Sequence, residues 1–416
     1  MRIGIDDTDS PRTMCTTYLG AVLARRLNES GIRVNRAYLV RLNPNVTFKT
    51  RGNAAIALDA EGDPKISFRL ACRCIEELAD FGAENTHPGI VVTEEKIPTA
   101  FFQRAVQDYC TREEATDLLD DAGALYRGYK NGRGLIGATA ATAAEFVDTT
   151  YEWLSYRSMD RWGSERYVDA ASLRASELAT SPHTWDTVDF QNRVVVCVPH
   201  TPDPVLFGIR GSNPFWVAKA RGFVRSEFPV CEQIYQTNQG TDSHLMKGTI
   251  GALIEGRSYD LFGTVAARPE TLVGGHVRVT IVEEYGTVSC MAFEPTKGFR
   301  DIVRSLLPGD RVRVTGSYKR GSINLEKLCI EALVEDTTLH PPLCPECVRR
   351  MTSAGRAKGY KCRHCGSRAS SPMTTVAPRT VQIGWYEVPS CARRHLAMPL
   401  IRAGLRIPDG GPGEPL

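Results

Sequence analysis

Apolar residues near the start of the chain recur first with the period of a strand and then with that of a helix. Ile3 and Ile5 alternate with other residues and predict a short buried strand. Residues 33–41 and the apolar run at 54–58 predict two further strands. Over residues 14–28 the apolar positions instead recur every three or four residues, as one face of a helix requires; they are Leu19, Val22, Leu23 and Leu27. The chain therefore begins as a mixed α/β domain.

The pattern is weaker between residues 59 and 258 but still alternates between helices and strands. Helices are favoured at 66–81, 98–126 and 135–146, and strands at 89–93 and 194–198. The helix at 135–146 is Ala-rich and follows a Gly-rich, basic segment at residues 129–137. Such a segment either brings backbone close to a ligand at a helix N-terminus or is a simple turn.

From residue 258 onward the pattern is all-β. Strands are predicted at 259–267, 276–281, 288–293, 311–317 and 323–331, with one helix at 296–307 between the third and the fourth. This succession is the layout of an OB-fold, a barrel that binds oligonucleotides. Cations for such a ligand are present at Lys297, Arg300, Arg311, Lys319 and Arg320. The alternative is a barrel with a structural or protein-binding role.

The composition is that of a globular protein, with 42% hydrophobic and 24% charged residues over 416 positions. That length exceeds a single core and indicates about two to four domains. The net charge is only +3, so a nucleic-acid surface has to be a local patch. No apolar run approaches the roughly 20 residues that span a bilayer. Thirteen cysteines and no N-terminal targeting segment indicate a reducing, cytoplasmic setting in which cysteines bind metal rather than form disulfides.

Four of the cysteines have the spacing of a zinc site. Cys344 and Cys347 form one C-x₂-C knuckle, Cys362 and Cys365 form another, and fourteen residues separate the two. Four thiolates complete a tetrahedron around a structural zinc and leave no open position for catalysis. Metal-free cysteines are the alternative. His364 lies inside the second knuckle and is interpreted as a bystander.

The predicted zinc ribbon is basic, which suits a phosphate backbone. Its cations are Arg349, Arg350, Arg356, Lys358, Lys361, Arg363 and Arg368. Residues 369–379 are expected to be a linker. Further along, Arg393, Arg394 and His395 form either another basic patch or the solvated face of a helix.

The strongest chemical signal is the acidic turn after the first strand. Asp6, Asp7 and Asp9 place three carboxylates within four positions. The predicted helix that follows offers unpaired N–H groups, which suit phosphate. Because carboxylates repel phosphate unless a hard cation lies between them, the turn predicts a Mg²⁺–nucleotide site, with Thr16 within reach of a phosphate. The alternative is that Asp9 or Ser10 is only an N-cap and the other acids are solvated.

A second polar turn follows the next predicted strand. Arg41, Lys49 and Arg51 place three cations near this turn, with Asn43 and Asn53 as neutral hydrogen-bonding neighbours. Arginine suits bidentate recognition of phosphate or carboxylate. A charged surface hairpin is the alternative.

Short blocks of sequence, found in one order along the chain, carry a specific resemblance. GIDDTDS at 4–10, MCTTYL at 14–19, RLNP at 41–44 and KTRGNAA at 49–55 resemble the archaeal tRNA(isoleucine) 2-agmatinylcytidine synthetase family, TiaS. Later matching blocks are GRGLIGA, PHTP, GIRG, AFEPTK, INLEK and YEVP. The resemblance covers essentially the whole chain. One departure is PRT at residues 11–13, where the family is expected to have Gly before the Met-Cys pair.

The resemblance implies a multidomain α+β protein. The implied domains are, in order, an α/β, kinase-like catalytic domain (1–58 and 128–200), a ferredoxin-like domain (59–127 and 201–255), an OB-fold (256–338), a zinc ribbon (339–370) and a C-terminal basic tail (371–416).

The resemblance also implies a reaction. Members of the family join agmatine to C2 of the wobble cytidine in the CAU anticodon of isoleucine tRNA, giving agmatidine and allowing AUA decoding. ATP first phosphorylates the O2 oxygen, and the agmatine amine then displaces phosphate. The implied cofactors are ATP, Mg²⁺ and structural Zn²⁺, and the implied partners are the tRNA and agmatine. Neither a membrane nor an obligate protein partner is implied.

The site residues implied by the resemblance lie in the two polar turns and the Gly-rich segment. Catalytic roles are expected for Asp6, Asp7, Asp9, Thr16, Lys49 and Arg51, where Thr16 matches a threonine tied to kinase activity in the family. Nucleotide contacts are expected for Asp7, Thr8, Ser10, Arg41, Asn43, Thr50, Gly52, Asn53, Gly134 and Gly137. Asp6, Asp7 and Asp9 are the expected magnesium ligands.

Two other functions fit parts of the sequence. A non-enzymatic protein that binds RNA or a single strand through its OB-fold and zinc ribbon would leave the N-terminal acids structural. A phosphatase of the haloacid-dehalogenase type requires Asp-x-Asp-x-Thr/Val after the strand, whereas Pro11 occupies the last place here. ATP consumption that depends on tRNA and agmatine separates the enzyme from the binding protein.

Overall fold

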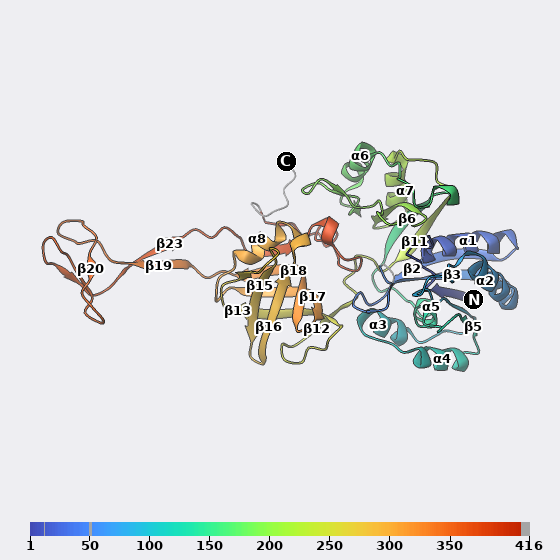
Figure 1. Ribbon diagram of the computed structural model, residues 1–416, viewed down its shortest axis with the longest axis horizontal. Coiled ribbons are helices and arrows are strands. Elements are labelled where there is room, and N and C mark those ends of the chain that lie inside the picture. Colours follow the sequence, from blue (N-terminus) through green and yellow to red (C-terminus); the bar gives the residue numbers. More distant parts are fainter. Residues whose placement is uncertain (12, 50–51, 409–416) are drawn as a thin grey trace.

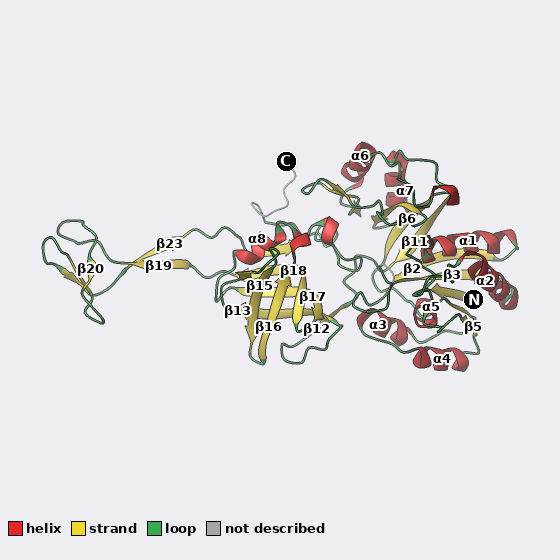
Figure 2. Cartoon of the chain, viewed as in Figure 1, coloured by secondary structure: helices red, strands yellow, loops and turns green. Residues whose placement is uncertain are grey.

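The chain folds into an α/β part, a β-barrel and a small cysteine-bearing ribbon (Figure 1). A computed structural model describes residues 1–11, 13–49 and 52–408. Most helices belong to the α/β part, and the barrel is built mainly from strands (Figure 2). Two strands form a neck that holds the ribbon away from the rest of the molecule (Figure 1). No helix in the described part of the chain is long and apolar enough to cross a membrane.

One nine-stranded sheet runs through the whole α/β part. Its strands are, in spatial order, β5 (Leu125–Gly128), β4 (Gly89–Thr93), β1 (Arg2–Asp6), β3 (Ala54–Glu61), β2 (Arg33–Arg41), β11 (Cys231–Thr237), β6 (Thr150–Tyr156), β10 (Val205–Gly211) and β7 (Thr184–Trp185). The predicted strand at the start of the chain is confirmed as β1, and both of its neighbours, β3 and β4, are antiparallel to it. The acidic turn therefore follows a strand of an antiparallel region of the sheet.

Helices cover both faces of the β1 half of the sheet. On one face lie α1 (Thr16–Glu29) and α2 (Pro64–Leu78), whose apolar residues form one core with Ile3 and Ile5. The apolar face predicted for the first helix is confirmed, because all four of its named residues are buried. On the other face lie α3 (Thr99–Gln107), α4 (Arg112–Asp121) and α5 (Gly134–Thr142). The β10 half is covered by α6 (Ala170–Thr180) and α7 (Pro214–Phe223).

The nine-stranded sheet consists of two halves that meet at one pair of strands. Residues 59–127, expected in a ferredoxin-like unit, contain β4, which pairs with β1. The β1 half and the β10 half meet where β2 and β11 pair in parallel over two residue pairs. That junction is where the sheet passes from one half to the other.

Several predicted elements have different bounds, three of them in the α/β part with a structural reason or consequence. The helical segment at 98–126 contains two helices, because Thr111 and Glu114 form a capping box that begins α4, and its last residues belong to β5. The Ala-rich helix ends at Thr142. The predicted buried strand at 194–198 is reduced to β9 (Val194–Val195), which is half-buried and pairs with β8 (Val188–Asp189) outside the main sheet.

The barrel follows the predicted succession of five strands with one helix. The strands are β13 (Ser258–Val265), β15 (Val277–Glu283), β16 (Gly286–Ala292), β17 (Arg311–Lys319) and β18 (Ser322–Ala332), and α8 (Phe299–Arg304) lies between β16 and β17. Pairing of β13 with both β17 and β15 closes the barrel. Short strands β12 (Leu245–Lys247) and β14 (Glu270–Thr271) extend the sheet.

The segment after the ribbon is structured, so the linker expected at 369–379 is a wrong prediction. There, β23 (Met373–Ala377) pairs with β19 (Asp336–His340) and forms the neck. Next, β24 (Gly384–Glu387) adds to the barrel beside β18. The chain leaves the barrel along β19 and returns along β23, so residues 373–377 of the expected linker form a paired strand and not a flexible linker. The ribbon itself contains β20 (Thr352–Ser353), β21 (Tyr360–Lys361) and β22 (Arg368–Ala369).

Residues 388–402, here called the C-terminal strap, lie between the α/β part and the barrel. Arg393 forms buried ion pairs with Asp186 and with Glu387, the latter at 2.6 Å. Arg394 donates to Asn45 Oδ1 at 3.0 Å and to Ser317 Oγ at 2.6 Å, which joins the two parts. The expected basic patch or solvated helix face at Arg393, Arg394 and His395 is therefore a wrong prediction, because Arg393 and Arg394 are bonded to buried partners.

Helix α5 packs directly against the backbone of β1 and β4. A Cβ added to Gly134 would lie 2.4 Å from Gly89 N and 2.7 Å from Asp6 O. A Cβ added to Gly4 would lie 2.2 Å from Ala138 O. These distances are shorter than any van der Waals contact, so the close approach of α5 requires glycine at both positions.

We expect Gly134→Ala to destabilise the protein by about 1–3 kcal/mol, because the atoms around the added methyl are backbone and cannot turn aside. Gly222→Ala is the matched control, because that α7 glycine has no heavy atom within 4 Å of an added Cβ. The control should be neutral or gain up to about 1 kcal/mol. Denaturant unfolding measures both, and equal stabilities for the two variants would contradict the role given to Gly134.

Candidate active site

A cleft of about 270 Å³ lies beside the acidic turn. It is bounded by the turn, the loop between β2 and β3, the end of α3 and the start of α5. The lining residues are Asp6, Asp7, Asp9, Thr16, Leu42, Val46, Thr47, Phe48, Lys49, Asn53, Ala54, Ala105, Asp108, Tyr109, Cys110, Arg133, Ile136 and Gly137. The structure thus brings the two predicted polar turns and one glycine of the Gly-rich segment to the same cleft.

The acidic turn is held by its own hydroxyl side chains. Ser10 Oγ accepts hydrogen bonds from the backbone N–H groups of Thr13 at 3.0 Å and Met14 at 3.2 Å. Thr8 Oγ1 donates to Thr16 Oγ1 at 3.1 Å. Thr8 and Ser10 are buried and do not line the cleft, so in this state they shape the turn instead of facing a nucleotide.

Asp9 caps helix α1. Its Oδ1 accepts from the backbone N–H of Thr16 at 2.5 Å and from the Thr16 hydroxyl at 3.0 Å. The N-cap position itself, Cys15, makes no side-chain capping bond. The N-cap interpretation of the sequence therefore describes Asp9, although its carboxylate also lines the cleft.

Asp7 forms a two-pronged ion pair with Arg133, the residue just before α5. Arg133 Nε donates to Asp7 Oδ2 at 2.9 Å, and its second nitrogen donates to Oδ1 at 3.0 Å. Asp7 has a left-handed backbone, with φ of +57°, which turns its side chain toward α5. Burial raises the pKa of Asp7 to about 6, even though Arg133 opposes that shift. Sequence reasoning missed Arg133; its place between two glycines of the GRG block was the available signal.

Asp6 is the most enclosed of the three acids. Its carboxylate lies against α5, where a Cβ on Gly137 would come within 1.9 Å of Asp6 Oδ2. Burial, and next the charge of Asp7, raise the pKa of Asp6 well above its ordinary range. Gly137 thus leaves room for the Asp6 carboxylate.

The three acids do not converge on one point. Among the described residues, the only group of three or more Cys, His, Asp or Glu ligand atoms lying within 4.8 Å of one another is the four-cysteine cluster of the ribbon. A magnesium ion held by three carboxylates alone is therefore not preformed. One or two carboxylates completed by phosphate oxygens and water is the usual arrangement of nucleotide-bound Mg²⁺, and the turn fits that donor set.

The loop between β2 and β3 brings Lys49 and Asn53 to the cleft. Burial, with Arg394 and Lys319 nearby, lowers the pKa of Lys49 to about 8. Asn53 has φ of +49° and donates to Asn43 O at 2.8 Å, which closes the loop. Thr50 and Arg51 lie outside the described residues.

Arg41, Asn43, Gly52 and Gly134 do not line the cleft. Arg41 is buried, and its Nε donates to Gln239 Oε1 at 3.0 Å, toward β11. Burial lowers the pKa of Arg41 to about 10. Asn43 donates to Gly256 O at 3.1 Å, at the entry to the barrel. Arg41 thus connects the β1 half of the sheet to the segment after β11, and Asn43 connects it to the barrel.

A wall of the cleft that the sequence did not indicate is formed by Asp108, Tyr109 and Cys110, after α3. Asp108 forms an ion pair with Arg257, just ahead of β13. No motif marks these residues, because their position depends on where α3 ends. This wall connects the cleft to the barrel.

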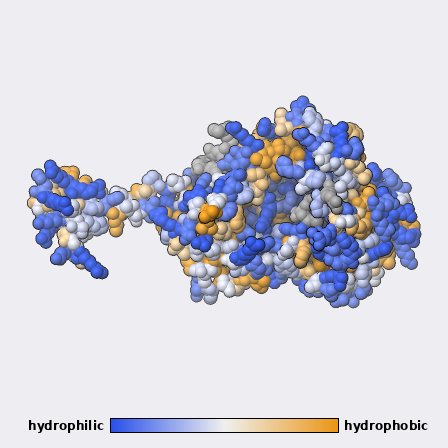
Figure 3. All heavy atoms as spheres, viewed as in Figure 1, coloured by the Kyte–Doolittle hydropathy of each residue, from blue (hydrophilic) through white to orange (hydrophobic). Residues whose placement is uncertain are grey.

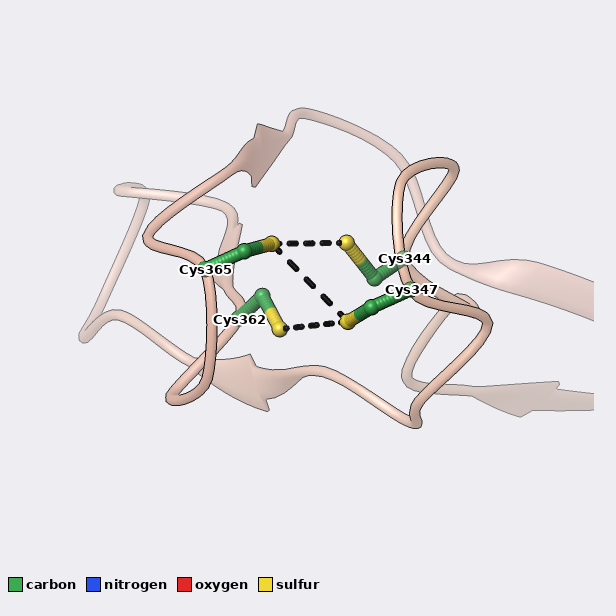
Figure 4. Close-up of side chains that lie close together, drawn as sticks. All are labelled: Cys344, Cys347, Cys362 and Cys365. Atoms are coloured by element: carbon green, nitrogen blue, oxygen red, sulfur yellow. Dashed lines mark hydrogen bonds between the residues drawn. The ribbon is translucent and has the colours of Figure 1, made fainter.

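The four ribbon cysteines converge as the zinc spacing predicts (Figure 4). The Sγ atoms of Cys344 and Cys365 are 3.2 Å apart, and those of Cys347 and Cys362 are 3.5 Å apart. Four sulfurs around a zinc at roughly 2.3 Å from each would lie close to these separations. The residues therefore fit a structural zinc. The surface of the ribbon is largely hydrophilic (Figure 3).

Comparison with known proteins finds similar proteins along the whole chain. Family models of the TiaS TCKD domain, the TiaS FLD domain and the TiaS C-terminal zinc ribbon domain match residues 2–68, 132–244 and 341–381. The isoleucine-tRNA 2-agmatinylcytidine synthetase TiaS of Methanocorpusculum labreanum is 49% identical over 403 residues, which cover 97% of each chain.

Solved structures are similar over nearly the same length. The crystal structure of TiaS in complex with an isoleucine tRNA and ATP matches with a TM-score of 0.91 and 41% identity, covering 96% of this chain and 97% of that one. The crystal structure of TiaS in complex with the same kind of tRNA, AMPCPP and agmatine matches with a TM-score of 0.88 and 40% identity, covering 96% of each chain.

We expect the purified protein to contain about one zinc per chain, bound by the four cysteines of the ribbon. Cys362→Ser should release the metal and unfold the ribbon, because metal binding and folding share their free energy in such small modules. Cys391→Ser, outside the ribbon, is the control. Elemental analysis and backbone NMR of the ribbon test this, and an ordered ribbon without zinc would contradict it.

Proposed function

The chain belongs to the TiaS family of isoleucine-tRNA 2-agmatinylcytidine synthetases, and we propose on that premise that it joins agmatine to the wobble cytidine of an isoleucine tRNA in an ATP-dependent reaction. The observation that carries this proposal is 49% identity over 97% of both chains. A cleft with acids and Lys49 supports it from the geometry. A non-enzymatic RNA-binding protein has no need of such a cleft.

The proposed reaction has two steps. Cytidine O2 first attacks the γ-phosphorus of ATP and ADP leaves, so that O2 becomes part of a phosphate ester. The primary amine of agmatine then attacks C2, the C2–O2 bond breaks, inorganic phosphate leaves and the amine loses a proton. Since the C2 carbon is inside the base stack of a tRNA loop, the cytidine has to turn out of the stack to enter the cleft.

The residues proposed for the chemistry are Asp6, Asp7, Asp9, Thr16, Lys49 and Arg51. Mg²⁺, when bound, neutralises charge on the transferring phosphoryl group, and Asp7 or Asp9 would hold it together with phosphate oxygens. Lys49 has a pKa lowered to about 8 and is still mostly protonated at pH 7, so it can stabilise charge that develops during transfer. The Thr16 hydroxyl, bonded to Asp9, lies on the cleft wall where a phosphate would meet α1.

The remaining nucleotide contacts that we propose come from Thr8, Ser10, Arg41, Asn43, Thr50, Gly52, Asn53, Gly134 and Gly137. Of these, Asn53 and Gly137 line the cleft in the present state. Among the described residues, Thr8, Ser10, Arg41, Asn43 and Gly52 lie off the cleft and would reach a nucleotide only after a rearrangement of the two polar turns. Thr8 and Ser10 are close enough in sequence to the acids for such a change to be local.

We further propose names for the parts. The β1 half of the sheet is the kinase-like catalytic domain, the β10 half is the ferredoxin-like domain, and the pairing of β2 with β11 is their boundary. Residues 256–338 form an OB-fold, supported by five strands with α8 between the third and fourth. The barrel and the basic ribbon grip the tRNA, and a cytoplasmic location follows from that substrate.

Asp7→Asn should slow agmatidine formation by about 10²–10³ in a single turnover, because it removes a charge beside the transferred phosphoryl group. Binding of tRNA should be unchanged, because the barrel and ribbon carry it. Asp117→Asn is the matched control, since Asp117 is exposed on α4. If Asp7→Asn reacts as fast as the parent, Asp7 is not a metal ligand. If the variant no longer binds tRNA, then catalysis and tRNA binding are not carried by separate parts of the molecule.

The ribbon can be removed without cutting the barrel. His340 and Met373 face each other as a pair at the end of the neck, so an Asn-Gly turn can join them in place of residues 341–372. We expect this deletion to weaken tRNA binding about tenfold or more at low salt, through lost phosphate contacts, and to leave ATP binding intact. Truncation at residue 340 is the contrasting control, because it also removes β24 and the strap and should destabilise the barrel. Unchanged tRNA affinity in the internal deletion would refute the role of the ribbon.

A further inference from the structure

The carboxylate of Asp7 is fully engaged in the described state. Both of its oxygens accept from Arg133, and the two side chains are 9% and 21% exposed. A third bond, from Arg133 to Asn85 O at 2.7 Å, fixes the guanidinium against the loop that precedes β4. Each oxygen keeps a second lone pair, but a metal that used it would lie close to the guanidinium.

A metal ion at Asp7 and the present position of Arg133 exclude each other. A dication bound to an Asp7 oxygen would lie within a few ångström of the guanidinium, and like charges so close repel strongly in a partly buried site. The other acids do not remove this conflict. Asp9 is bonded to the N-terminus of α1, and Asp6 is enclosed against Gly137. Arg133 therefore has to release Asp7 when the metal arrives.

The released guanidinium stays in the same cleft. Arg133 directly precedes α5, whose backbone is fixed against β1 and β4 by Gly134. The bond to Asn85 O is independent of Asp7 and can persist. Arg133 already lines the cleft, and the anion expected there is a polyphosphate, which arginine recognises through two parallel hydrogen bonds.

We propose that Arg133 is an exchangeable counterion: it neutralises Asp7 in the empty enzyme and passes to the polyphosphate of ATP when a divalent metal takes its place. Binding of the metal and of the nucleotide is then coupled. The metal replaces Arg133 as the partner of Asp7, and the nucleotide provides a new partner for the released arginine. This inference rests on the proposed function, since it takes Asp7 to be a metal ligand. The competing explanation is that Arg133 is only a structural clamp between the acidic turn and the loop before β4.

The two explanations differ in the change they predict for the Mn²⁺ affinity of Arg133→Met when no nucleotide is present. The probes are Mn²⁺, followed by electron paramagnetic resonance, and a non-hydrolysable ATP analogue with Mn²⁺, followed by calorimetry, on the full zinc-loaded chain. If Arg133 is an exchangeable counterion, Arg133→Met should bind Mn²⁺ alone several-fold more tightly and the Mn²⁺–nucleotide about tenfold or more weakly. Arg133→Lys keeps the charge without the planar fork and should show a smaller loss for the nucleotide.

Two controls keep the result interpretable. Arg127→Met removes an exposed arginine of β5 that pairs with Glu76 at 2.9 Å, and should change neither affinity. Asp7→Asn should weaken binding of both probes; if it does not, Asp7 is not a metal ligand and the assignment made under the proposed function fails with it. If Asp7→Asn weakens binding but Arg133→Met weakens both probes or changes neither, the exchange is refuted while the assignment of Asp7 stands. Thermal unfolding of each variant identifies any that fails to fold, and Arg133→Lys then carries the test.

Discussion

The close contact between helix α5 and strands β1 and β4 is the constraint on which the candidate site depends. Glycine occupies contact positions on the helix and on the strands, so the helix packs directly against the strand backbone. This fixes the start of α5 beside the end of β1, and therefore fixes Arg133 beside Asp7 and Gly137 beside Asp6. The arrangement puts three acids into a partly buried turn at a large desolvation cost. It is tolerated because each acid has its own compensation: an arginine, a helix N-terminus, or a raised pKa.

The C-terminal strap applies a second constraint, between the α/β part and the barrel. Arg393 satisfies acids of the β10 half and of β24, and Arg394 spans from the β2–β3 loop region to the barrel. His395 Nδ1 is 2.7 Å from Arg210, and the pKa of that histidine is lowered well below its ordinary range by burial and by Arg41. The ring is thus a neutral acceptor among cations. The relative positions of the barrel and the catalytic cleft are set by a few buried, charged contacts, which are directional in a way that apolar packing is not.

Local signals in the sequence were sufficient where one element decides its own structure. The apolar period of α1, the strands of the barrel and the C-x₂-C knuckles all belong to this class, and each was confirmed. The failures concern relations between distant segments. No local pattern states that β4 pairs with β1, that residues 373–377 return along the neck, or that Arg393 meets Asp186, 207 positions earlier in the chain. Arg133 was missed for the same reason: a basic residue in a Gly-rich loop gains its meaning only from the acid that the fold places beside it.

The strap follows both halves of the sheet and most of the barrel in the sequence, and this order has a consequence for biosynthesis. Domains emerge from the ribosome and fold from the N-terminus onward, so both halves of the sheet and most of the barrel are made before residues 388–402. Until then Asp186 lacks the buried partner that it has in the finished molecule, and β18 lacks β24. Chains that terminate early, even a few dozen residues short, lose the contacts that orient the cleft toward the barrel. Synthesis through residue 402 is in this way a condition for orienting the cleft toward the barrel, and cellular proteases and chaperones act on a chain that lacks the strap as on an unfolded one.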